Sequence, residues 1–159
     1  MSAIIRGMRP DDIEEVESLY QEYMEIGASR RKILLESLER KDSEVLVAEV
    51  GGSVVGVAHQ VFYTDPLHAG KCSNILFLYV AKPFRRQGIG ESLLRRMLDN
   101  AADKGVLEVH VSTRAGNVAA VSLYEKNGFE HAGPLFECTP DAQTDASSGT
   151  ASTCDSTAT

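Results

Sequence analysis

The order of apolar and polar side chains predicts helices and strands along most of the chain. A short strand begins at residues 4–5, and Asp11 and Glu14 then have the spacing of a capping box before a helix. A second helical piece around residues 33–38 follows a break near Gly27. The apolar face of the first helix consists of Ile13, Val16, Leu19, Tyr20 and Tyr23. This part of the chain therefore predicts one strand and two amphipathic helices.

Extended segments come next. Residues 45–50 and 54–62 flank Gly51-Gly52-Ser53, which is a strong hairpin signal. A loop over residues 64–71 is expected to lead into residues 74–80, which read N-I-L-F-L-Y-V. Apolar side chains follow one another along this segment, so both faces of an extended chain would be apolar. The segment therefore predicts a strand covered on both faces.

The helical period returns in the second half of the chain. Residues 89–101 predict an amphipathic helix that Gly105 ends, and residues 106–112 predict a strand. Asn117 is expected to cap a helix that runs through Lys126. A last short strand is expected to begin at Phe129, which gives the order βααβββαβαβ.

The turn Arg85-Arg86-Gln87-Gly88-Ile89-Gly90 joins the buried strand to the central helix. Alternate glycines let the backbone approach a ligand, and the free amides of a helix start attract phosphate groups. Two other phosphate loops are excluded, because Leu93 replaces the third glycine of the dinucleotide fingerprint and Val57 stands where a P-loop needs lysine. The turn thus predicts a site for a different diphosphate ligand, with an ordinary tight turn as the alternative.

Composition narrows the class of protein. A chain of 159 residues with 43% hydrophobic content predicts one folded domain. Its 16 basic and 23 acidic residues give a net charge of −7, which argues against a nucleic-acid partner. The sequence has no run of 18 apolar residues and no secretory signal pattern, so we expect no membrane partner and a cytoplasmic location.

Two further expectations come from composition. The four histidines and three cysteines show no metal-ligand spacing, so we expect reduced thiols and no metal. Beyond Phe136 the chain becomes rich in Ser, Thr, Ala and Asp and has no basic residue. We therefore expect a folded domain over residues 1–137 and a disordered tail over residues 138–159, because such a tail cannot bury enough apolar surface to order itself.

Two of these motifs resemble those of the GNAT superfamily of acyl-CoA-dependent N-acyltransferases, over about residues 3–136. The segment L-Y-V-A-K-P-F-R-R-Q-G-I-G-E-S-L-L is similar to the family's CoA pyrophosphate motif, and N-V-A-A-V-S-L-Y-E-K-N-G-F is similar to its second motif. The resemblance implies an α/β fold with a central mixed, mostly antiparallel sheet, splayed central strands and helices on both faces. Because the polar tail follows residues 129–136, the closing strand of the family is expected to be missing or supplied by the second subunit of a homodimer.

The resemblance also implies a binding site for acetyl-CoA. The amides of residues 87–91 would hold the pyrophosphate, with Arg85 in the leading basic position and Arg86 adding positive charge. Main-chain groups near Tyr79 and Val80 would pair with the pantetheine arm, which Asn117 would touch while it caps its helix. The cofactor-binding residues are thus expected to be Tyr79, Val80, Arg85, Arg86, Gln87, Gly88, Ile89, Gly90, Glu91 and Asn117.

Catalytic roles follow from the same resemblance. Tyr124 matches the tyrosine that protonates the departing thiolate as general acid, and the alternative is a core tyrosine. Many relatives carry a glutamate base on the central strand, but residues 75–78 contain no acid, which favours a chain of water molecules. Glu108 and His110 share one face of their strand and are candidates for a base relay, with a structural role as the alternative. Further candidates on the acceptor side are Tyr63, Asp65 and Glu25.

The implied function is an N-acetyltransferase that moves an acetyl group from acetyl-CoA to a primary amine of a small molecule, peptide or protein by direct attack in a ternary complex. The alternatives are a catalytically silent acyl-CoA-binding or regulatory module and a protein-interaction domain. The sequence leaves the acceptor open among polyamines, aminoglycosides, amino acids and peptide amino termini, and residues 21–43 and 63–71 are expected to select it.

Overall fold

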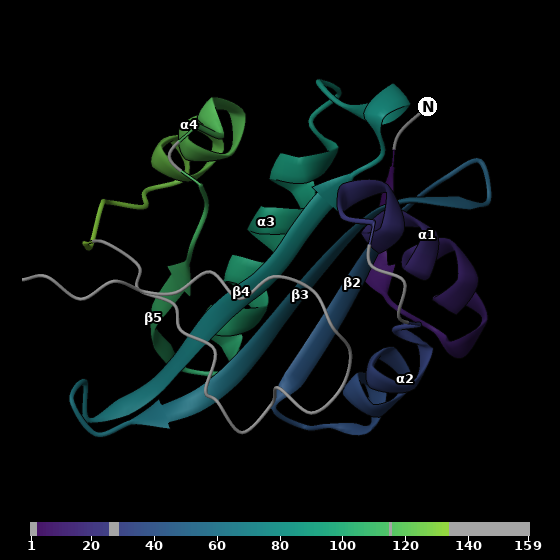
Figure 1. The fold of residues 1–159 in the computed structure, drawn as a ribbon. Helices are drawn as coiled ribbons and strands as arrows, with labels where there is room; N and C mark the ends of the chain where they lie inside the picture. The colour runs from purple at the N-terminus through teal and green to yellow at the C-terminus, as the bar shows by residue number, and fades with distance from the viewer. Residues whose placement is uncertain (1–2, 26–28, 115, 134–159) are drawn as a thin grey trace, which may run out of the picture.

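The computed structural model describes residues 3–25, 29–114 and 116–133, which form one sheet with helices on both of its faces (Figure 1). The sheet has five strands in the order β1-β2-β3-β4-β5, antiparallel except for the parallel pair β4–β5. The strands are β1 (Ile4–Gly7), β2 (Ser43–Val50), β3 (Ser53–Asp65), β4 (Gly70–Val80) and β5 (Val106–Val111). The helices are α1 (Ile13–Tyr23), α2 (Arg31–Glu39), α3 (Ile89–Asp103) and α4 (Val118–Lys126), with short 3-10 helices at Pro10–Asp12 and Lys82–Phe84.

Two apolar cores cover the two faces of the sheet and confirm the predicted α/β architecture. On one face, α1 and α2 pack through Val16 and Leu34 against Val47 and Val57 of the central strands. On the other face α3 packs against β2, β3 and β4, with the side chains of Leu93, Leu94 and Met97 fully buried. The helical spacing of those apolar residues is what directs one face of α3 to the sheet.

The N-terminal strand is fixed to α1 by an ion pair. The Arg6 guanidinium donates to both carboxylate oxygens of Asp12, at 2.7 and 2.8 Å, and to Glu49 at 2.8 Å. Asp12 also accepts a hydrogen bond from the backbone amide of Arg9 at 2.7 Å. The predicted capping box of Asp11 and Glu14 is therefore wrong: the N-cap of α1 is Asp12, whose side chain turns inward to Arg6 and makes no cap hydrogen bond to α1, and Asp11 is exposed.

Half of the loop predicted over residues 64–71 is strand. Thr64 pairs with Lys71 and Asp65 pairs with Gly70, so only residues 66–69 form the turn of the β3–β4 hairpin. Asp65, Pro66 and Gly70 are residue types that favour turns, so they obscured the ends of the two strands in the sequence pattern. This hairpin extends beyond the end of β2, which pairs with β3 only as far as Val61, while β5 follows β4 as far as Lys71 (Figure 1).

The sheet opens between β4 and β5. The parallel pairing of the two strands ends at Ile75 and Val111. At the same level β4 carries an extra residue, since His59 lies opposite Phe77 and Gln60 lies opposite Ile75, which leaves Leu76 without a partner on β3. Such a bulge bends its strand and increases the local twist. The splayed strands are thus confirmed, whereas the prediction that both faces of β4 are covered fails at Leu76, whose side chain is 51% exposed.

The chain after α4 differs from the prediction. Residues 127–133 contain no strand, so the short strand expected to begin at Phe129 is absent from the described residues of that segment. Residues 134–137 and the tail expected over residues 138–159 lie outside the described residues, and the boundary between domain and tail stays a prediction. Among the helices that the structure describes, none combines the length and the apolar character needed to cross a lipid bilayer.

Replacing Asp12 with asparagine is expected to lower the free energy of unfolding by about 1.5–3 kcal/mol at neutral pH, because Arg6 loses its charged partner. The hydrogen bond from Arg6 holds the pKa of Asp12 below its ordinary value. The advantage of the wild type is therefore complete above about pH 4 and is lost as the pH falls through the lower pKa of the folded protein. Thermal unfolding across the acid range checks this, with the exposed Asp11→Asn as control; a Tm difference that is independent of pH would contradict it.

Candidate functional site

The turn before α3 has the backbone geometry of an anion-binding site. Gly88 is the N-cap of α3 with φ of 78°, and Arg86 also has a positive φ of 62°. Within residues 85–103, all of which the structure describes, the first amide bonded into the helix is that of Ser92, which donates to the Gly88 carbonyl at 2.9 Å. The amides of residues 86–91 donate to no backbone carbonyl there. They are free to bind an anion at the positive end of the helix dipole.

The two arginines of the turn differ in their contacts. The Nε of Arg85 donates to the Val80 carbonyl at 2.8 Å, and its guanidinium lies 4.9 Å from the ring centroid of Tyr79. Arg85 therefore folds back over the end of β4, between the turn and the strand. Arg86, Gln87 and Gly88 are exposed to solvent, while Ile89 is buried and anchors the start of α3 in the core.

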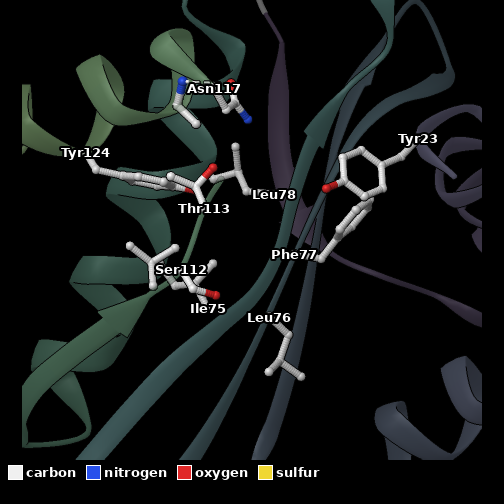
Figure 2. A pocket seen from close by; sticks show the side chains of 11 residues that line it. Tyr23, Ile75, Leu76, Phe77, Leu78, Ser112, Thr113, Asn117 and Tyr124 are labelled. Carbon is white, nitrogen blue, oxygen red and sulfur yellow. Dashed lines mark hydrogen bonds between the residues drawn. The ribbon is translucent and has the colours of Figure 1, made fainter. Parts of the chain in front are cut away.

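A small cavity of about 80 Å³ lies where β4 and β5 separate (Figure 2). Residues of β4 form one wall, the end of β5 and the start of α4 form the other, and Tyr23 enters from α1. The lining residues are Tyr23, Ile75, Leu76, Phe77, Leu78, Val111, Ser112, Thr113, Asn117, Ala120 and Tyr124. None of these residues is acidic, so the predicted lack of a carboxylate base on β4 extends to the whole described lining.

Asn117 and Tyr124 occupy the α4 side of this cavity. Asn117 is the N-cap of α4, as predicted, and its Oδ1 accepts a hydrogen bond from the Ala120 amide at 3.3 Å. Tyr124 is half-buried, and its hydroxyl points into the cavity (Figure 2). Burial raises the pKa of the Tyr124 phenol, and the nearby Tyr23 adds to the shift. The phenol therefore keeps its proton at neutral pH.

Tyr23 is a cavity residue that the sequence assigned to the apolar face of a helix. It ends α1, its side chain is 51% exposed, and its hydroxyl points into the cavity from the side opposite Tyr124 (Figure 2). Its ring packs edge-on against Phe77 and Tyr79, with centroids 5.2 and 5.6 Å away. Helical spacing alone could not distinguish it from the core residues one turn earlier, because the difference arises from its position at the helix end.

Glu108 and His110 share one face of β5, as predicted, but they do not line the cavity. The Nε2 of His110 lies 3.3 Å from Oε1 of Glu108, and Nδ1 of His110 lies 2.7 Å from the hydroxyl of Tyr63. The cavity begins one residue farther along, at Val111, and includes Ser112. Glu108 and His110 thus form a polar cluster on β5 next to the cavity, and Tyr63 links this cluster to β3.

Glu91 connects the turn to the opposite wall of the cavity. It lies in the first turn of α3. Its carboxylate accepts hydrogen bonds from the Arg95 guanidinium at 2.8 Å and from the Lys126 ammonium of α4 at 2.9 Å. Lys126 holds the pKa of Glu91 below its ordinary value. The residue expected to bind a ligand through its amide therefore also holds α4 in place through its side chain.

Comparison with known proteins identifies the same protein family by sequence and the same fold by structure. A family model described as the acetyltransferase (GNAT) family matches residues 11–129. The chain is similar to N-acetyltransferase 8 of Homo sapiens, with 35% identity over 101 residues, which are 64% of this chain and 44% of that protein. The match thus spans less than half the length of that relative.

Solved structures share the fold. Glucosamine-6-phosphate N-acetyltransferase from Arabidopsis thaliana superposes with a TM-score of 0.77 at 18% identity, covering 89% of this chain and 100% of that one. AAC(6')-Iy in complex with the bisubstrate analog CoA-S-monomethyl-acetylneamine gives a TM-score of 0.77 at 17% identity, covering 88% and 99%. At these identities the likeness concerns the fold alone.

Proposed function

The chain belongs to the acetyltransferase (GNAT) family, and from this premise we propose that it transfers an acetyl group from acetyl-CoA to a primary amine of a small molecule, peptide or protein. The observation that carries the proposal is the position of the free amides of residues 86–91 beside a cavity between two splayed strands. The family uses acetyl-CoA, whose diphosphate and extended pantetheine arm match these two features.

In this proposal the turn holds the diphosphate through the amides of residues 87–91, and Arg86 adds positive charge. Arg85 orients the end of β4 through its bond to Val80. The edge of β4 beyond Ile75 has no partner on β5 and can pair with the pantetheine arm near Tyr79 and Val80. The free amide hydrogens of the Asn117 side chain can donate to the same arm, because its oxygen is used as the helix cap.

The chemistry is a direct attack of a neutral amine on the thioester carbonyl. A new C–N bond forms, the carbonyl oxygen becomes an oxyanion, and collapse of the intermediate breaks the C–S bond. Tyr124 donates its proton to the departing thiolate, and its raised pKa ensures that the phenol carries that proton at neutral pH until this step. A backbone amide near Val80 would stabilise the oxyanion. Holding both reactants in place would remove several kcal/mol of the activation barrier, as in other reactions in which two bound reactants are held together.

The proton released by the attacking amine needs an acceptor. Because the described cavity lining contains no carboxylate, water molecules on Ser112 and Thr113 are the first step of the proposed path. Glu108 and His110 lie next along β5 and would receive the proton at the end of that path. A catalytically silent acyl-CoA-binding module is the second candidate, and the acid-free lining is the observation that favours it.

Thiol release from acetyl-CoA across a panel of amines separates the two candidates. The panel should contain polyamines, aminoglycosides, amino acids and peptide amino termini. Acetyl transfer to one class is expected. Binding of acetyl-CoA with no release of thiol above the spontaneous rate for any amine would favour the silent module, and failure to bind CoA would contradict both.

Tyr124→Phe is expected to lower kcat by about 10- to 100-fold while the affinity for acetyl-CoA stays nearly the same, because the variant loses only the proton donor. Ser122→Ala, which removes an exposed hydroxyl from the same helix outside the cavity, serves as the control. Steady-state kinetics measure the change in kcat, and a titration with CoA measures the affinity. An unchanged kcat in Tyr124→Phe would remove this tyrosine from the mechanism.

Gly88→Val is expected to weaken CoA binding by at least about tenfold, because a β-branched residue at a φ of 78° displaces the amides of the turn. Gly105→Val is the matched control, since Gly105 has a φ of 69° beyond the C-terminal end of the same helix. Both variants should lose similar thermal stability, but only Gly88→Val should lose affinity in a calorimetric titration. Equal affinity in the two variants would contradict the diphosphate site.

A further inference from the structure

The β3–β4 hairpin brings together three side chains whose types do not occur in the cavity lining. Asp65 ends β3, His68 lies in the turn, and Cys72 lies in β4. One ligand atom from each of these residues lies within 4.8 Å of the other two. A carboxylate oxygen, an imidazole nitrogen and a thiol sulfur thus converge in the pattern D-x-x-H-x-x-x-C.

We propose that Asp65, Nδ1 of His68 and Cys72 bind a divalent transition metal ion of the Zn²⁺ type, with a fourth position open to solvent. A tetrahedral ion with bonds of about 2.0–2.3 Å separates its ligand atoms by about 3.3–3.8 Å, which small side-chain shifts reach from the present separations. Thiolate and imidazole ligands select Zn²⁺ or Co²⁺ over Mg²⁺ and Ca²⁺, which prefer oxygen.

The surroundings of His68 match those of a metal-binding histidine. Its Nδ1 faces Asp65, and its Nε2 lies 2.8 Å from a carboxylate oxygen of Glu108. Histidines that bind metal commonly donate their other N–H to a carboxylate in this way, which fixes the tautomer and the ring orientation. Glu108 is itself held by His110, which contacts the hydroxyl of Tyr63.

The burial of Cys72 and its strand pairing place its thiol on the side of the proposed metal site that is away from solvent. Cys72 is fully buried, and the neighbouring strands place Tyr63 and Glu108 beside it as its register partners. The side chains of Asp65 and His68 are 22% and 32% exposed, so an ion can enter from solvent and reach the thiol last. Burial and the carboxylates of Asp65 and Glu108 raise the pKa of the Cys72 thiol. A bound cation offsets the unfavourable effect of burial and of the two carboxylates on the charged form, and so stabilises the thiolate.

The sequence predicts no metal because one histidine and one cysteine four residues apart, His68 and Cys72, are not by themselves a metal-ligand pattern. The third ligand, Asp65, and the orienting Glu108 become recognisable only when the hairpin register and the parallel β4–β5 pairing are known. The site lies on the hairpin side of the polar cluster and shares Glu108 with the proposed proton path, so metal binding is tested below by readouts other than acetyl transfer.

A titration of the metal-free full-length chain with Co²⁺ tests the site. One equivalent of Co²⁺ should produce thiolate-to-metal charge-transfer absorption in the near ultraviolet, and Zn²⁺ should abolish that absorption by displacement. Cys72→Ser should lose the absorption, whereas the double variant Cys138→Ser/Cys154→Ser should keep it. Absence of the absorption in the wild type, or its survival in Cys72→Ser, would overturn the proposal.

A second measurement avoids dependence on a buried substitution. His68→Ala and Asp65→Asn change half-buried residues at the turn and should each reduce the affinity for Zn²⁺ by at least about tenfold in calorimetry. Zn²⁺ should raise the Tm of the wild type but not that of His68→Ala. His131→Ala, which removes an exposed histidine, is the control and should bind as the wild type does. Equal Zn²⁺ affinity in His68→Ala and the wild type would contradict the assignment.

Discussion

The opening of the sheet between β4 and β5 determines where this fold can accept an extended ligand. Main-chain groups inside a protein need hydrogen-bond partners, yet β4 continues past its last pair with β5, Ile75 and Val111, with β3 beside it on one edge and no strand on the other. The extra residue at Leu76 bends β4 at this level. Asn117 at the N-terminal end of α4 and Ala120 and Tyr124 within α4 line the gap from the other side. An edge left unpaired in the interior favours an extended ligand, and the free amides beside it favour an anionic one.

The parts of the fold that depend on local chemistry were predictable from the sequence. Gly88 and Gly105 mark the ends of α3, and Asn117 caps α4, because turn and cap residues act over only a few positions. The same holds for the backbone geometry of the turn before α3 and for the position of Tyr124 in the cavity lining, since both belong to short motifs. For these elements the sequence located the ends to within one or two residues.

Features that depend on contacts between distant segments were not predictable. The bulge at Leu76 follows from the register with β3, and the position of Tyr23 in the cavity follows from how α1 crosses the sheet. Instead of the expected strand, the described residues after α4 show the Phe129 amide donating to the Tyr124 carbonyl at 3.1 Å and the Phe129 ring packing on that of Tyr124, with centroids 5.5 Å apart. Likewise, the convergence of Asp65, His68 and Cys72 needs the hairpin register, which composition does not contain.

The attachment of α4 has a consequence for how salt concentration acts on this protein. None of its residues is fully buried, so the helix is held by the partial burial of Leu123 and Tyr124 and by the ion pair between Lys126 and Glu91. Dissolved ions screen exposed ion pairs of this kind. Raising ionic strength therefore loosens the helix that carries the phenol, while the backbone amides of the turn, which belong to the well-packed α3, keep their positions.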